Sequence, residues 1–89
     1  EDRVDQHVFN SCLAHLDVTI SDLHDAISAE DFLQIAELAH LMKGGFYLLK
    51  NDSLADLCTE LEEAADRKTI SFCLQLALRL EDAVSDLSS

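Results

Sequence analysis

The sequence predicts an all-α fold, an antiparallel four-helix bundle in which residues 1–89 form a single domain. Proline is absent and the only two glycines are adjacent, so the usual helix breakers are almost missing. Apolar residues recur at helical spacing in four segments, and the connections between these segments are short. A chain of 89 residues can bury one core, but it has no room for a separate ATP-binding lobe.

The first two predicted helices span about residues 4–28 and 31–50. Asp17 and the β-branched pair Thr19 and Ile20 leave open a break of the first helix in two. The apolar seams are Phe9, Leu13, Leu16, Ile20, Leu23 and Ile27 in the first helix and Ile35, Leu38, Met42, Gly45 and Leu49 in the second.

The last two predicted helices each follow a polar capping sequence. Asn51, Asp52 and Ser53 are typical of a turn and N-cap, and Thr69 is a second candidate cap. The charged residues 66–68 separate the two helices. The seams are Leu54, Leu57, Leu61 and Ala64, followed by Ile70, Cys73, Ala77, Leu80, Val84 and Leu87.

Composition excludes several classes of partner. The net charge of -12, with no basic stripe, argues against nucleic acid binding, because the phosphate backbone would be repelled. No apolar run is long enough to cross a bilayer, and we expect no membrane contact by this domain. We interpret Cys12, Cys58 and Cys73 as reduced, half-buried core residues, since no Cys-x-x-Cys pair is present. A cytoplasmic location follows, although a parent protein could be anchored in the inner membrane.

The chain begins with Glu1 and has no initiator Met, which favours a domain of a larger protein, although a processed start would look the same.

At 100° per residue, His40 lies opposite the apolar seam of the second helix, on its outward side. Leu33 and Tyr47 would then be exposed apolar residues, which indicates a docking surface, although they could instead cover a gap to another helix and belong to the edge of the core. Residues within about 60° of His40 are Leu33, Ala36, Glu37, Lys43, Gly44 and Tyr47. Lys43 and Lys50 would give one edge of this strip a local positive charge.

The residues around His40 suit a histidine that carries a phosphoryl group. A free imidazole has a pKa of about 6.5, so near pH 7 one ring nitrogen is unprotonated and nucleophilic. Lys43 would balance charge on the phosphoryl oxygens, and Gly44 would leave space beside the ring. Glycine inside a helix is unfavourable by about 1 kcal/mol relative to alanine, so both glycines need a reason. We expect Gly45 to face inward and to let a neighbouring helix approach.

These residues resemble the histidine-containing phosphotransfer (HPt) domains of bacterial and eukaryotic multistep phosphorelays. The resemblance covers roughly residues 20–70. Lys50 departs from it, because many members have glycine ten residues after the histidine, and the amino-terminal part is shorter than in many members. The matching positions are Ala39, His40, Met42, Lys43 and Gly44, then Leu54, Ala55, Cys58, Leu61 and Glu62, with the stretch 26–31 also similar.

The resemblance implies a phosphorelay intermediate. His40 would accept a phosphoryl group from the aspartate of one response-regulator receiver domain and pass it to another. Such a domain has no ATP-dependent kinase activity, although its parent could be a sensor histidine kinase. The chain itself would need no cofactor, because the Mg²⁺ would belong to the receiver. We expect a monomer that docks receivers through Leu33, Ala36, Glu37 and Tyr47.

Two alternatives remain open from the sequence. His40 could be a surface histidine of a purely structural interaction bundle, with Lys43 solvated or paired with Glu37. The spacing Glu37-x-x-His40 also occurs in di-iron helical bundles, but the sequence has no second such pair and both side chains point away from the seam. For His7, His15 and His24 we expect solvated or capping roles.

Overall fold

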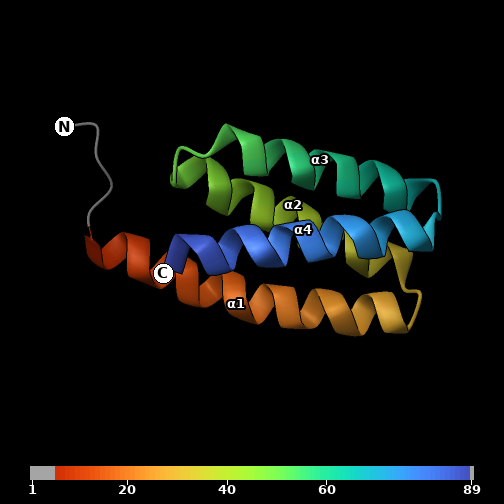
Figure 1. The fold of residues 1–89 in the computed structure, drawn as a ribbon. Helices are drawn as coiled ribbons and strands as arrows, with labels where there is room; N and C mark the ends of the chain where they lie inside the picture. The colour runs from red at the N-terminus through yellow and green to blue at the C-terminus, as the bar shows by residue number, and fades with distance from the viewer. Residues whose placement is uncertain (1–5, 89) are drawn as a thin grey trace.

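The computed structural model describes the backbone of residues 6–88 and the side chains of residues 11 and 13–87. It contains four helices, α1 (Gln6–Ser28), α2 (Phe32–Leu48), α3 (Asp52–Asp66) and α4 (Ile70–Ser88), which run alternately up and down (Figure 1). Each helix packs against two others, in the order α1, α2, α3, α4 and back to α1. The predicted four-helix bundle is therefore confirmed. Among the described residues, no helix has the length and apolarity needed to span a membrane.

The first helix is one continuous element, so the predicted alternative of a break near Asp17 is wrong. Thr19 is buried, and its hydroxyl donates a hydrogen bond to the carbonyl oxygen of His15, 2.8 Å away. This bond satisfies the polar group inside the helix. Ile20 is buried in the core and Asp17 is exposed to solvent. Tertiary packing thus outweighs the weak helix propensity of the β-branched pair.

Polar caps fix the starts of α2 and α3. Asp31 precedes α2, and its Oδ1 accepts the backbone N–H of Gln34 at 3.2 Å. Asn51 precedes α3, and its Oδ1 accepts the backbone N–H of Leu54 at the same distance of 3.2 Å. Each bond satisfies a backbone donor that has no partner within the helix. The cap predicted at residues 51–53 is confirmed, with Asn51 as the capping residue.

Three residues that follow helices have left-handed backbones although none of them is glycine. Glu30, Lys50 and Lys68 have φ values of 53°, 58° and 58°. In each case the next residue donates its N–H to a carbonyl of the last helical turn, as in a Schellman motif. These bonds are Asp31 to Ala26 at 2.9 Å, Asn51 to Phe46 at 2.8 Å and Thr69 to Ala64 at 3.0 Å. Lys50 therefore makes the turn at the position where the resembling family often has glycine.

Replacing Lys68 with glycine is expected to stabilise the bundle. A left-handed conformation costs an L-residue roughly 1 kcal/mol that glycine does not lose, and part of this gain is offset by glycine's greater freedom in the unfolded chain. We expect Lys68→Gly to raise the free energy of unfolding in urea by up to about 1 kcal/mol. Arg67→Gly is the control, because Arg67 has φ -83° and gains nothing from glycine. Equal stability of the two variants would contradict this account.

The core is a single cluster that contains residues from all four helices. Most residues of the predicted seams lie in it. Among the described seam residues, those that are only partly buried are Leu13, Gly45, Leu49, Leu57, Ile70 and Leu87. In α2, Phe46 is fully buried although the predicted seam did not include it. Phe9 lies outside the described side chains. Cys58 and Cys73 are free thiols that are fully buried, not half-buried as predicted. The side chain of Cys12 also lies outside the described residues.

Candidate functional site

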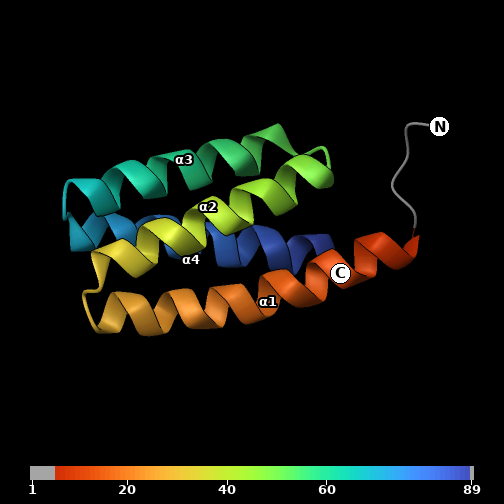
Figure 2. The same cartoon turned by 180° about the vertical axis from the view of Figure 1, so that it is seen from behind.

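His40 lies on the outward face of α2, in the middle of that helix. Its side chain is 75% exposed, whereas Met42 is buried two residues further on. Leu33 and Tyr47 are 73% and 56% exposed, so the apolar residues predicted to flank His40 do face solvent. Figure 2 shows α2 in front of α4, seen from the opposite side to Figure 1. The imidazole is therefore accessible to a protein that approaches α2 from solvent.

A carboxylate from α3 joins the imidazole to the nearby lysine. Glu62 Oε2 lies 3.6 Å from His40 Nδ1, and Glu62 Oε1 forms an ion pair with Lys43 Nζ. The helices α2 and α3 pack together along their lengths, and this packing brings Glu62 alongside the turn between His40 and Lys43. We call these three residues the His40 cluster. Glu62 matches the resembling family's pattern, but the sequence analysis assigned it no role.

The lysine is less exposed than the sequence suggested. Its side chain is 20% exposed, and the pKa of Lys43 is raised first by the hydrogen bond that its ammonium group donates to Glu62 and then by the charge of the same carboxylate. The ammonium group therefore stays charged well above neutral pH. Two predictions need correction. Lys43 forms an ion pair with Glu62 and not with Glu37. The carboxylate of Glu62 also balances the positive charge of Lys43. The edge with Lys43 and Lys50 is thus not an uncompensated basic edge.

The two glycines have different surroundings. A Cβ atom added at Gly44 would meet no atom within 4 Å, so the side of His40 next to Gly44 is open. A Cβ atom at Gly45 would lie 3.7 Å from Leu16 Cδ2, which is ordinary van der Waals contact. Gly45 therefore faces the neighbouring helix α1 as predicted, but the approach of that helix does not require glycine, since alanine would fit there.

The surface beside His40 is shallow and mostly apolar. A hollow next to the ring is lined by Ala36, Glu37, His40 and Leu41. Leu41 and Leu48 are exposed, and the sequence analysis did not place them on this surface. The sequence did indicate that some of these residues are exposed, because α2 contains more large apolar residues than one buried face can accommodate.

Cys58 lies one turn before Glu62 on α3, but it is not a second nucleophile. Burial, followed by the charge of Glu62, raises the pKa of the Cys58 thiol to about 12. The thiol is therefore protonated at neutral pH and has no access to solvent. Of these two side chains, only the imidazole of His40 is exposed to solvent.

Comparison with protein families agrees with this geometry. The family model of the Hpt domain matches residues 7–89, which is nearly the whole chain. The chain belongs to the Hpt domain family. An Hpt domain carries a phosphoryl group on histidine in a phosphorelay, interacts with receiver domains and is a carrier, not a kinase. Searches of curated proteins and of solved structures find no match.

Other histidines of the Hpt domain have different surroundings from His40. His24 Nε2 lies 3.4 Å from Glu81 Oε2 on α4. His24 therefore faces a carboxylate, whereas we expected a solvated or capping role. His15 is exposed, and His7 lies outside the described side chains. No group of at least three metal-ligating side chains is found in the part of the chain that the structure describes. Glu37 and His40 also face solvent, which removes the basis for a di-iron site inside the bundle.

Gly44 is expected to matter for access to the Hpt histidine and not for the fold. Gly44→Ala should raise the free energy of unfolding by up to about 1 kcal/mol, because the added methyl group meets open space. Gly44→Gln should slow phosphoryl transfer at least about tenfold, since the longer side chain would keep the donor from its reactive position. The checks are urea denaturation and transfer assays of both variants. Full transfer by a normally folded Gly44→Gln protein would refute the steric explanation.

Proposed function

We propose that His40 accepts a phosphoryl group from the aspartyl phosphate of one receiver domain and passes it to the aspartate of another. The observation that carries this proposal is the His40 cluster, an exposed imidazole joined through Glu62 to Lys43. A reversible carrier needs an accessible ring nitrogen, a nearby cation and space for the phosphoryl group. Gly44 supplies that space. The domain acts as a monomer in this proposal.

Glu62 determines which ring nitrogen reacts. Its Oε2 faces Nδ1, so the tautomer with hydrogen on Nδ1 is favoured, and the lone pair of Nε2 is left free on the exposed side. Nε2 attacks phosphorus, the Nε2–P bond forms, and the P–O bond to the receiver aspartate breaks. The ring gains positive charge in this step, and the carboxylate of Glu62 stabilises it. The reverse sequence of bonds returns the phosphoryl group to a second aspartate.

Lys43 lies one turn after His40 and supplies the cation on this chain. Its ion pair with Glu62 holds the ammonium group near the ring before the phosphoryl group arrives. Charge on the phosphoryl oxygens is then balanced by an ammonium group that is already in place. The Mg²⁺ of the reaction is proposed to belong to the receiver.

The direct test is transfer of radiolabel from a phosphorylated receiver domain to this protein. We expect a label that is lost in acid and stable in alkali, as for phosphohistidine, and mapping of the labelled peptide to His40. Nuclear magnetic resonance of the product should place phosphorus on Nε2. A labelled carboxylate or hydroxyl group, or phosphorus on Nδ1, would contradict the mechanism.

Removing the cation is expected to slow transfer without unfolding the domain. In Lys43→Ala, charge on the phosphoryl oxygens loses its partner, and we expect transfer to slow about ten- to a hundredfold. The measurement is single-turnover transfer at subsaturating receiver, with Lys68→Ala as a control for loss of a lysine far from the cluster. If Lys43→Ala and the control transfer at the same rate as the unmodified protein, Lys43 takes no part in the reaction.

A further inference from the structure

Acidic residues border the apolar surface beside His40. Two neighbouring hollows share Ala36, one lined also by Glu37, His40 and Leu41, and the other by Glu62, Glu63 and Asp66. The docking surface is therefore continuous from α2 across to the carboxyl-terminal half of α3. We call Glu37, Glu63 and Asp66 the acidic rim.

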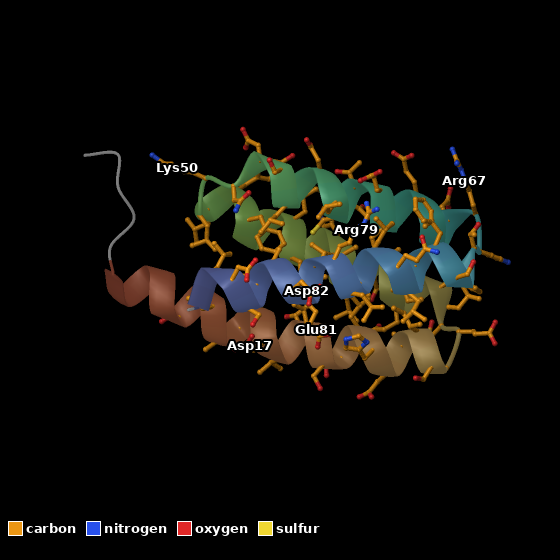
Figure 3. All side chains as sticks on the ribbon, in the orientation of Figure 1. Asp17, Lys50, Arg67, Arg79, Glu81 and Asp82 are labelled. Carbon is orange, nitrogen blue, oxygen red and sulfur yellow. The ribbon has the colours of Figure 1, made fainter. Side chains whose placement is uncertain are left out.

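Within the described part of the chain, the charges of the acidic rim are not balanced by ion pairs. All three side chains are exposed, and within residues 13–87, where side chains are described, none of them forms an ion pair. Glu62 differs, because Lys43 neutralises it. Figure 3 shows Lys50 and Arg67 near opposite ends of α3, with Arg67 pointing outward at the end of the bundle. The rim is thus a negative surface next to an apolar one.

We propose that the acidic rim selects among receiver domains, favouring those with Lys or Arg residues beside the apolar part of their docking face. This inference rests on the proposed function. Exposed leucines such as Leu33 and Leu41 provide affinity, but they discriminate weakly among partners that all present apolar docking faces. Charge around an apolar contact does discriminate, because a wrong partner brings like charges together.

The residues of the acidic rim lie outside the His40 cluster, so the rim can affect which receiver binds without taking part in phosphoryl transfer. Ala36, which the two hollows share, lies one turn before His40, or about 6 Å along the helix axis. A basic residue of the partner can therefore contact Glu63 or Asp66 without displacing Lys43 from the His40 cluster. Rim charges of this kind act mainly on the rate of association and on its salt dependence.

The test uses a charge reversal with a matched control. Glu63→Lys combined with Asp66→Lys reverses part of the rim. Asp17→Lys combined with Asp82→Lys changes the net charge equally, at exposed positions on α1 and α4 that Figure 3 shows on the side facing away from α2. Both proteins are assayed with two phosphorylated receivers, one with basic and one with acidic residues beside its apolar docking face.

With the basic receiver, we expect the rim variant to lose about tenfold in kcat/KM at low salt and the control to lose less than about twofold. At high salt the difference should shrink, and the transfer rate at saturating receiver should stay unchanged. With the acidic receiver, the kcat/KM of the rim variant should increase. Equal losses in both variants, or an unchanged preference between receivers, would overturn the inference. If neither receiver labels even the unmodified protein, the proposed function has failed instead.

Discussion

Replacing His40 with glutamine is expected to abolish phosphoryl transfer and to leave the fold intact. Glutamine has similar size and can still face Glu62, but its amide nitrogen is not a nucleophile. The side chain is 75% exposed, so the free energy of unfolding should change by no more than about 0.5 kcal/mol. The measurement pairs a label-transfer assay with a urea denaturation curve. Transfer should fall below detection while the unfolding midpoint stays unchanged.

The control for this experiment is His24, which among the described histidines also faces a carboxylate. His24 lies 3.4 Å from Glu81, yet it has no lysine in an ion pair with that carboxylate among the described residues. His24→Gln is therefore expected to transfer at the normal rate. Label that persists in His40→Gln would end the assignment of His40 as the carrier. Loss of label in His24→Gln would show that a nearby carboxylate alone can support the reaction.

The face of α2 that carries His40 could be predicted from the sequence because helix geometry is periodic. Residues at three- and four-residue spacing share a face, so the buried Met42 places His40 on the solvent side without any tertiary information. The starts of α2 and α3 could be predicted for a similar reason, since a cap depends on residues within one turn, such as Asn51 and Leu54. Local rules were sufficient for both features.

The contact of Glu62 with His40 could not be predicted from local rules. It depends on how far α3 is displaced along α2, and the turn at Lys50 and Asn51 sets that displacement. A helical wheel gives the face of each helix but not the relative height of two helices. Only the resemblance pointed to Glu62, and it did so without stating what the carboxylate contacts.

Phe46 shows a second limit of the sequence analysis. A seam drawn through Gly45 and Leu49 follows the same spacing as one drawn through Phe46, and periodicity alone does not decide between them. The structure buries Phe46 completely and leaves the other two partly exposed. Side-chain volume explains the result, because a large aromatic ring gains more from burial than glycine does.

Replacing Met42 with aspartate is expected to unfold the domain. Met42 is 1% exposed inside the core, and among the described residues no cation is placed to pair with a carboxylate there. An unpaired buried charge costs several kcal/mol, about 3 to 5 in measured cases, and small domains have only about 5 to 15 kcal/mol of stability. Leu38→Asp is expected to act in the same way, since Leu38 is also buried. The measurement is circular dichroism with thermal melting.

The same substitution on the outward face is expected to have the opposite pattern of effects. Leu33→Asp and Tyr47→Asp should leave the domain folded and weaken receiver binding by at least about 1 kcal/mol, because they remove apolar contacts at the docking surface. Leu33 is the cleaner test, since it lies in the first turn of α2, where a negative charge is favourable, whereas Tyr47 lies in the last turn. Titrations with a receiver and melts of all four variants decide the matter. If Tyr47→Asp or Leu33→Asp unfolds the domain while Met42→Asp does not, α2 presents the other face to solvent, and His40 cannot be the exposed carrier.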